Sequence, residues 1–395
     1  MIKKLVWLLM SLFLLASCGG GTDLASNGVG SGGTGSYTSG PVSGLGSIIV
    51  NGVRYDVENA TVTDDDGTVG FGKSSLNLGM LVEVQGTDIT AGVGGATDVA
   101  TATVVKASSD FVGRVSTVNT SGSVITSIVL FGRQIDIDSK TVYSYPIHVN
   151  DCVVVHGLVA SGGYKATRID QSTACAQRMK LSGVVHGLTD SGGAPRFKVG
   201  LPGTAAEQTI FYGSATVNNA AALANGAIVR VVVNPVPFAG AWGADRVRVV
   251  GAAVDASRVA RLEGLIARLD DQQHFVVNGV VVDASGVSIG STLSEGDRVE
   301  LRGRIVNGRL VLTQSPVVES GADIDDREVE LHGRITTVNA GATTIVVRGL
   351  VVNFSAAILR DGAPQFDQCV EVRGKLFNLS NQLIATEVKT DNDCR

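Results

Sequence analysis

An alternation of apolar and polar residues recurs five times along the chain, at intervals of about seventy residues. The segments begin at Gly79, Asn150, Gly226, Gly296 and Asp367 and read GMLVEVQG, NDCVVVHG, GAIVRVVV, GDRVELRG and DQCVEVRG. Their fourth and sixth places are always aliphatic, whereas the fifth and seventh are mostly polar or charged. Because successive side chains of a strand point to opposite faces, this alternation predicts a strand with one face in a core and one in water.

Two apolar runs joined by a short turn precede four of these strands. The runs IIVNGVRYDV, VLFGRQIDI, FVVNGVVVDA and IVVRGLVVNF place Gly52, Gly132, Gly279 and Gly349 at the second turn position. A type I′ turn needs positive φ at both central residues, so these segments predict β-hairpins. The third copy carries a longer insert, VGLPGTAAEQTIFYG, in this region.

Further apolar segments open and close the copies. FVGRVSTV, LSGVVHGL, LEGLIARL and LHGRITTV open copies two to five, and closing strands such as YKATRID and LIATEVK end most of them. Each copy therefore has about five strands, and a small sheet must close or pair to protect its edges. We expect an all-β chain, a tandem array of about five small OB-like antiparallel β-barrels, with β-sandwich modules as the alternative.

The repeated modules resemble the domain-of-unknown-function 5666 family. The residues that carry the resemblance are GLGSIIVNGVRYD, the Gly-x-x-Val-Glu-Val-x-Gly strand and the closing Ala-Thr-x-Ile/Val strand. The resemblance runs from about residue 41 onward and is weak in the third module. It implies tandem modules in bacterial lipoproteins and brings no catalytic residues to this chain.

The N-terminus has the features of an export signal. Lys3 and Lys4 precede an apolar run that is too short to span a bilayer of roughly 30 Å. Leu15-Ala16-Ser17-Cys18 resembles the lipobox of bacterial lipoproteins, which implies cleavage before Cys18 and a lipid anchor on it. An ordinary signal peptide with an incidental cysteine is the alternative. Gly19, where Asp favours inner-membrane retention, indicates an outer-membrane lipoprotein, periplasmic or surface-exposed.

The expected boundaries follow from these patterns. They are 1–17 for the lipoprotein signal peptide, 18–40 for a Gly/Ser-rich tether, and 41–109, 110–176, 180–251, 261–318 and 328–395 for β-modules 1 to 5. The tether lacks any apolar period and is expected to be a flexible coil.

The remaining four cysteines fall in matching columns of modules 2 and 5. Cys152 and Cys369 occupy the same strand place, and Cys175 and Cys394 both follow the closing strand. In an exported chain this predicts disulfides Cys152–Cys175 and Cys369–Cys394. Residues equidistant from a hairpin turn face each other within the range of a disulfide, and strand alternation predicts both bridges on the outward face, opposite Val153 and Val370. Free thiols or metal ligands are the alternative.

The sequence shows few signs of a reaction centre. It lacks the G-x-S-x-G, H-E-x-x-H, P-loop and Rossmann patterns, so we expect no catalytic residues, metal or cofactor. His156 and His332 are expected to face solvent. TDDDGTVG and ADIDDRE are interpreted as solvated turns, with calcium binding as the alternative.

Trp242 and Phe238 are the candidate ligand-binding residues. They lie in NPVPFAGAWGAD of module 3, where they could stack on a sugar or cap the core. The formal net charge of −5 and the 5% content of aromatic residues disfavour nucleic acid.

We therefore expect a non-enzymatic, lipid-anchored envelope lipoprotein that acts as a scaffold, spacer or binding module. Its expected partners are the membrane, through the N-terminal lipid, and an envelope protein or glycan. Binding of polysaccharide or another envelope ligand is the alternative function, and an envelope hydrolase a weaker one. An integral outer-membrane barrel is disfavoured because the polar strand faces are too charged for lipid.

Overall fold

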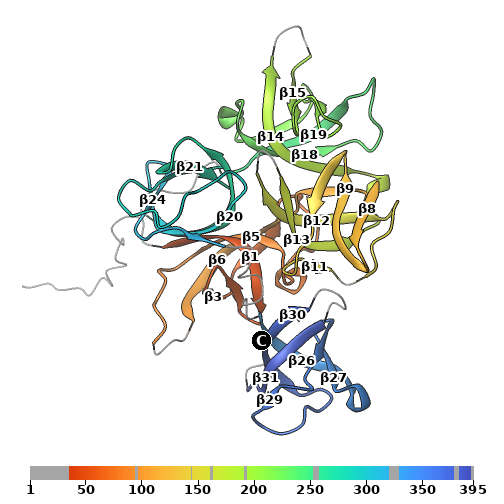
Figure 1. Ribbon diagram of the computed structural model, residues 1–395, viewed down its shortest axis with the longest axis vertical. Helices are drawn as coiled ribbons and strands as arrows, with labels where there is room; N and C mark the ends of the chain where they lie inside the picture. The colour runs from red at the N-terminus through yellow and green to blue at the C-terminus, as the bar shows by residue number, and fades with distance from the viewer. Residues whose placement is uncertain are drawn as a thin grey trace, which may run out of the picture. The chain divides into compact units, whose positions relative to one another are not determined.

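The computed structural model describes residues 35–93, 97–143, 145–160, 163–190, 194–251, 258–319, 329–377 and 382–392. Strands dominate these segments, and the helical turns among them are short 3-10 turns of three residues (Figure 1). None of the helices in the described ranges is long and apolar enough to cross a membrane. The expected signal peptide, Cys18 and the first part of the tether lie outside these residues. The all-β expectation is confirmed.

The strands group into five modules. Module 1 contains β1 (Ser36–Leu45), β2 (Ile48–Val50), β3 (Val53–Asp56), β4 (Thr61–Asp64), β5 (Leu81–Gly86) and β6 (Asp98–Ser108). Module 2 contains β7 (Phe111–Arg114), β8 (Thr117–Ser121), β9 (Val124–Leu130), β10 (Arg133–Asp136), β11 (Val142–Tyr143), β12 (Cys152–Val159) and β13 (Tyr164–Gln171). Module 3 contains β14 (Met179–Thr189), β15 (Arg196–Val199), β16 (Gln208–Phe211), β17 (Thr216–Asn218), β18 (Ile228–Val233) and β19 (Trp242–Val249).

The last two modules follow the same order. Module 4 contains β20 (Val259–Leu269), β21 (His274–Val277), β22 (Val280–Asp283), β23 (Arg298–Val306), β24 (Arg309–Leu312) and β25 (Val317–Val318). Module 5 contains β26 (Val329–Asn339), β27 (Thr344–Val347), β28 (Leu350–Asn353), β29 (Ile358–Leu359), β30 (Cys369–Phe377) and β31 (Gln382–Thr390).

Every module closes its strands into a ring with the same connections. In module 5, antiparallel pairs join β26 to β27, β27 to β28, β31 to β30 and β30 to β26, while β28 and β31 pair in parallel. The corresponding ring is β1-β2-β3-β6-β5 in module 1 and β20-β21-β22-β24-β23 in module 4. Module 3 repeats it, and module 2 does so with its opening strand divided into two consecutive parts, β7 paired with β12 and β8 paired with β9. A closed ring leaves no open edge, so the barrel expectation is confirmed over the sandwich.

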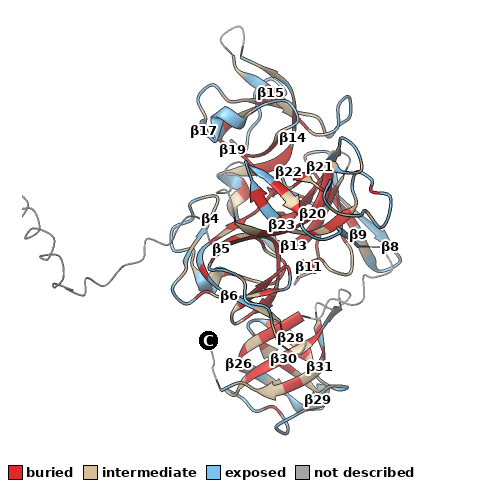
Figure 2. Ribbon diagram, turned by 90° about the vertical axis from the view of Figure 1, so that its left-hand side faces the viewer, coloured by how far each residue is buried: buried red, intermediate tan, exposed pale blue. Residues whose placement is uncertain are grey.

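Tight turns and aliphatic cores explain why these segments form barrels. Asn278 and Gly279 both have positive φ, of 50° and 75°, as a type I′ hairpin requires. The aliphatic places of the recurring strands point inward: Val299 and Leu301 of module 4 are fully buried. Figure 2 shows the buried residues concentrated along the barrel strands. The hairpin and core predictions are therefore confirmed.

Module 3 reaches the same ring without the tight turn. The connection from β15 to β16 spans residues 200–207 instead of two turn residues. Phe197 and Ile210 face the core from these strands, and both have no exposed surface. The ring therefore depends on the buried positions of the strands, which this module retains.

The last residues of the expected tether form a strand instead. Residues 36–40, assigned to it, form the first half of β1, where Ser36 and Thr38 have no exposed surface. This half of β1 pairs with β5 of its own module and with β20 of module 4. The prediction of a coil is wrong here because these residues are small and polar, with Tyr37 the one large apolar side chain, and therefore lack an apolar alternation. Small residues suit a strand that has other barrels on its outer side.

Backbone pairing also joins the modules. β1 runs parallel to β20 over Ser36–Ser39 and parallel to β26 at Gly44 and Leu45. β7 of module 2 meets β14 of module 3, where Val112 is paired with Lys180. Each of these contacts involves the opening strands of both modules. The described barrels are therefore docked on one another through a recurring part of the fold.

Candidate functional site

Several strand positions expected to face water are buried instead, Arg230 and His156 among them against neighbouring parts of the chain. Arg230 and His156 are each 5% exposed and Glu371 is 9% exposed, although all three occupy polar places of the recurring strand. Glu83 and Glu300, at equivalent places, are half-buried. The solvent-facing prediction is wrong here because alternation shows only which side chains point away from the core of their own module. It does not show whether water or a polar group of the protein lies on that outer side.

Lys180 of β14 joins module 3 to module 1. Its Nζ donates to Asp65 Oδ1 at 2.7 Å and to Asp66 Oδ1 at 2.9 Å, in the turn that follows β4. The side chains of Lys180 and Asp65 are 3% and 1% exposed. Burial raises the pKa of Asp65, but the charges of Lys180 and Arg230 outweigh it, so the net pKa is lowered. The Asp65 carboxylate therefore stays charged although it is almost completely buried.

This contact corrects the interpretation of TDDDGTVG as a solvated turn. The side chains of Asp65 and Asp66 are only 1% and 11% exposed, and the ammonium group of Lys180 contacts both, where a calcium ion held by the pair would have to bind. The turn therefore serves as an acceptor for module 3. The second acidic stretch, residues 322–328, lies outside the described residues.

Arg230 of β18 makes a second buried ion pair beside the first. Its Nε donates to Asp110 Oδ1 at 2.8 Å, and its Nη1 lies 3.7 Å from Asp65 Oδ2. Burial lowers the pKa of Arg230, but the negative charges of Asp110 and Asp65 raise it by more than burial lowers it. The guanidinium group therefore stays charged. Asp110 lies between β6 and β7, so this pair joins module 3 to the connection between modules 1 and 2.

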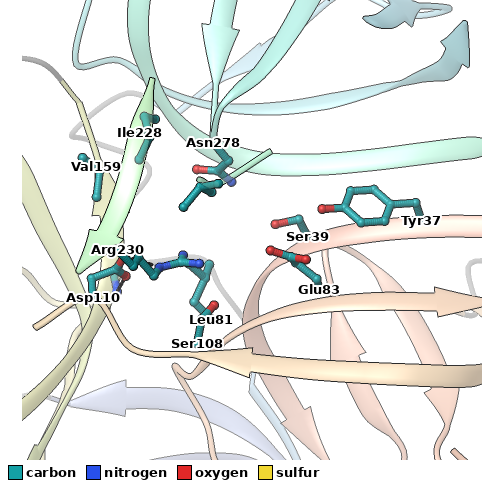
Figure 3. A pocket seen from close by; sticks show the side chains of 12 residues that line it. Tyr37, Ser39, Leu81, Glu83, Ser108, Asp110, Val159, Ile228, Arg230 and Asn278 are labelled. Atoms are coloured by element: carbon teal, nitrogen blue, oxygen red, sulfur yellow. Dashed lines mark hydrogen bonds and ion pairs between the residues drawn. The ribbon is translucent and has the colours of Figure 1, made fainter. Parts of the chain in front are cut away.

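A small polar cavity lies at this junction. Figure 3 shows Arg230 and Asp110 on one side of it and Tyr37 and Glu83 on the other, with Asn278 contributed by module 4. Its volume is about 20 Å³, which admits a water molecule but no larger ligand. The geometry is that of a joint between four modules.

Module 4 is held to module 1 by the same kind of contact. Arg261 of β20 forms an ion pair with Asp98 at the start of β6. Glu263, two residues further along β20, is fully buried and accepts from Arg298 Nε at 2.9 Å. Charged residues on the outer face of the opening strand thus recur at the contacts of modules 3 and 4.

The disulfide between Cys152 and Cys175 is confirmed, with 5.9 Å between the Cα atoms. The expected facing of the two cysteines across the hairpin was wrong, whereas the bridge does lie on the outward face of the module 2 barrel, outside its core. The residue opposite Cys152 is Ser172, and Cys175 lies beyond β13 in a 3-10 turn. The hairpin pairs Val159 with Tyr164, so its turn is centred earlier than the midpoint of the two cysteines. Both cysteines are buried, packed with Val112 where module 2 meets module 3.

Cys369 of module 5 is disulfide-bonded as well. Its expected partner, Cys394, lies outside the described residues, so that pairing stays a prediction. The N–H of Asp391 donates to the Cys369 carbonyl, as the N–H of Ser172 does to the Cys152 carbonyl. The two cysteines therefore occupy equivalent strand ends.

His156 is a second correction to the expected solvent-facing residues. Its Nδ1 donates to the Ser108 carbonyl at 2.6 Å, and the residue is buried between modules 1 and 2. Burial lowers the pKa of His156 below the usual value of 6.5, although the hydrogen bond to Ser108 opposes this. The neutral ring is therefore the form that fits the folded chain.

Acid is expected to destabilise the chain through His156. As the pH falls below 6.5, His156 is protonated in the unfolded chain but stays neutral in the folded chain. The free energy of unfolding therefore falls until the pH reaches the lowered pKa of His156 in the folded chain. Urea unfolding between pH 8 and pH 5 should show a smaller loss in His156→Gln than in the wild type. His148→Gln, at a largely exposed site, is the matched control and should behave as the wild type.

His332 lies in a charged cluster on module 5, so its predicted exposure is also wrong. Its Nε2 is 2.6 Å from Glu330 Oε1, and its Nδ1 is 2.9 Å from Asp391 Oδ2. Arg54 of β3 in module 1 pairs with the same Glu330 oxygen. Burial raises the pKa of Glu330, but hydrogen bonds from His332 and Arg54 lower it to about 2.

The same cluster has donors close enough for a metal ion. Ligand atoms of Glu330, His332 and Glu371 lie within 4.8 Å of one another. However, Arg54 pairs with Glu330, and Lys389 Nζ lies 2.8 Å from Glu371 Oε2. Because cations of the chain already neutralise the carboxylates, we assign no metal to this cluster.

The two candidate ligand-binding aromatics are not equivalent. Trp242 Nε1 donates to Gln208 Oε1 at 2.8 Å, and its ring lies edge-on to Phe131 of module 2, with 5.4 Å between centroids. Phe238 is 82% exposed in the loop before β19. The structure thus places Trp242 in the packing between modules 2 and 3 and leaves Phe238 as the exposed aromatic.

Two connected grooves on module 1 were not anticipated from the sequence. One has a volume of about 360 Å³ and includes Lys73 and, from module 5, Arg348. The other, of about 310 Å³, includes Asp88 of the β5–β6 connection. They share Ser47 and Asp56. No motif indicated them because the residues that line them are scattered over several connections and over two modules.

Comparison with known proteins identifies the modules and gives no function. The model of DUF5666, a domain of unknown function, matches residues 39–100, 112–170, 263–313 and 332–389. No curated protein matches the chain. Drosophila Unr CSD456 is 13% identical, with 53% of this chain and 96% of that chain covered and a TM-score of 0.15. A Streptococcus pneumoniae multidomain protein with nucleic acid binding domains is 9% identical, with 54% and 73% covered and a TM-score of 0.13.

Superpositions with such low TM-scores carry no argument about this protein. The family matches, in contrast, fall on modules 1, 2, 4 and 5 and span more than half of the sequence. The third module lies outside the matched ranges, yet its strands close into the same ring. The chain belongs to the DUF5666 family.

Proposed function

We propose that the protein is a non-enzymatic lipoprotein, anchored to the outer membrane by lipid on Cys18, whose docked barrels form a preassembled scaffold. The observation that carries the scaffold is the set of buried ion pairs between modules, above all Lys180 with Asp65 and Arg230 with Asp110. Burying a charge is costly unless it is paired, so these residues depend on a partner from another module. Modules joined only by flexible linkers would have no need of such ion pairs. The lipobox-like sequence before Cys18 supports the anchor.

The anchor is tested by Cys18→Ala in the full-length precursor. The variant is expected to lose signal-peptide processing and lipid labelling, and to leave the outer-membrane fraction. Ser17→Ala keeps a small residue before the cysteine and serves as the control, with processing as in the wild type. Unchanged processing and membrane association of Cys18→Ala would rule out the anchor.

A second candidate function is binding of an envelope polysaccharide, favoured by the two grooves on module 1. OB folds bind oligosaccharides with the loop between their first and second barrel strands and the loop between their fourth and fifth. In module 1 these are the β1–β2 and β5–β6 connections, because β4 lies outside the five-stranded ring. Ser47 lies in the first of these connections, and Thr87 and Asp88 lie in the second. Hydroxyl and carboxylate groups of this kind can hydrogen-bond sugar hydroxyls.

This second function is tested by glycan binding of Asp56→Asn/Asp88→Asn. The double variant is expected to lose at least tenfold in affinity, because each removed charge weakens a charge-assisted hydrogen bond. Asp245→Asn, on module 3, is the matched control. If the double variant binds as the wild type does, or if no glycan binds the wild type, polysaccharide binding at these grooves is wrong.

A further inference from the structure

We propose that the contact between modules 1 and 5 is weakened by acid, because protonated His332 competes with Arg54 for Glu330. Glu330 Oε1 accepts from His332 Nε2 at 2.6 Å and also from Arg54 Nη2. Arg54 is the residue of module 1 that reaches this carboxylate, whereas His332 belongs to the same strand as Glu330. One oxygen thus serves an internal partner and a partner from the neighbouring module.

Module 5 by itself favours the charged imidazolium ring. Both ring nitrogens of His332 face carboxylate oxygens of Glu330 and Asp391, and Glu371 Oε2 lies 3.9 Å from Nε2. Both nitrogens can donate only when the ring is protonated. Burial lowers the pKa of His332, but these carboxylates outweigh it, and the pKa is raised above its usual value.

Module 1 opposes that charge in two ways. Arg54 Nη1 lies 3.2 Å from His332 Nε2, so docking brings a second positive charge against the ring. Gly46 covers the other side so closely that a Cβ there would lie 2.5 Å from His332 Cβ. Water is thereby removed from the ring, which disfavours its charged form.

The remaining charged groups around His332 belong to module 5. Arg373 Nε lies 3.1 Å from Glu371 Oε1, and Lys389 Nζ lies 2.8 Å from Glu371 Oε2. Arg348, in the β27–β28 turn, donates to the His332 carbonyl. These groups stay with His332 whether or not module 1 is docked, so the change on docking comes from Arg54 and from burial.

Linkage fixes the direction of the effect. If docking disfavours a proton on His332, a proton on His332 must disfavour docking by the same factor. Docking is strongest at a pH above the pKa values of both states, and it weakens as the pH falls through them. Because the pKa is already raised in the docked chain, this change occurs above pH 6.5.

Hydrogen exchange of the full-length protein tests the proposal between pH 6 and pH 9, after correction for the intrinsic pH dependence of exchange. Protection of amides in residues 44–49 and 329–331, on the two sides of the contact, is expected to be about tenfold higher at pH 9 than at pH 6. Protection within β28, in the module 5 barrel, reports whether that barrel stays folded.

Two variants and one control make the outcome decisive. His332→Gln is expected to abolish the pH dependence, and Arg54→Gln to leave protection low at every pH. His274→Gln, an exposed histidine paired with Asp271 in module 4, should leave the dependence unchanged. Protection that does not vary with pH in the wild type, that rises as the pH falls, or that keeps its pH dependence in Arg54→Gln would overturn the proposal, even if His332→Gln failed to fold.

Discussion

Lys180→Met is expected to lower the free energy of unfolding by about 3–5 kcal/mol, the range for removing one partner of a buried ion pair. The substitution keeps the length of the side chain and removes its charge. It leaves the carboxylates of Asp65 and Asp66 without the ammonium that both of them contact. Urea unfolding followed by far-UV circular dichroism measures the loss for the modules concerned, because a chain of five barrels need not unfold in one step.

Lys198→Met is the matched control for this substitution. Lys198 lies in the same module and pairs with Glu207, but its side chain is 45% exposed, so the expected loss is within about 1 kcal/mol. Adding Asp65→Asn to Lys180→Met should recover part of the stability, since it removes the stranded charge. A loss no larger for Lys180→Met than for Lys198→Met would show that the contact does not stabilise the chain.

Gly303→Ala is expected to destabilise module 4 by about 3 kcal/mol, at the upper end of the usual penalty for overpacking. A Cβ at Gly303 would lie 2.2 Å from the Val311 carbonyl oxygen, on the neighbouring strand of the ring. Gly86, Gly157 and Gly374 occupy the equivalent places of the recurring strand in modules 1, 2 and 5, and a Cβ at each would lie 2.2 to 2.5 Å from a carbonyl oxygen. The recurring glycine is thus explained by a close approach of two strands.

Gly286→Ala provides the comparison within the same module. No atom lies within 4 Å of the position that its Cβ would take, so the expected change is within about 0.5 kcal/mol. Differential scanning calorimetry of the two variants measures the difference. Equal thermal stability of Gly303→Ala and Gly286→Ala would contradict the steric explanation.

The barrels could be predicted from the sequence because their determinants are local and repeated. Asn278-Gly279 specifies its turn through positive φ at both residues, and the pair Val299 and Leu301 specifies one inward face. The strand signal recurs in five copies and the turn signal in four, and the two kinds of signal reinforce one another. Module 3 lost the turn signal, and it retained enough of the buried pattern to form the same ring.

The joints could not be predicted because their determinants are distant in the sequence. Asp65 and Lys180 are separated by 115 residues, and although Asp65 lies in the acidic stretch TDDDGTVG, nothing in the sequence pairs that stretch with Lys180. Polar alternation at Arg230 and His156 reports only that these side chains leave the core, and in a single barrel they would face water. The same reason explains why Ser36–Ser39 resembled a tether: a strand between barrels needs small residues more than apolar ones.

If the barrels are docked through the charged outer faces of their strands, as we claim, Lys180→Met should loosen the joint between modules 1 and 3 on both of its sides. Hydrogen exchange of the full-length variant should show faster exchange on both sides of the joint, in residues 61–66 of module 1 and residues 179–184 of module 3. Faster exchange confined to module 3, with residues 61–66 protected as in the wild type, would contradict the claim and indicate independent barrels.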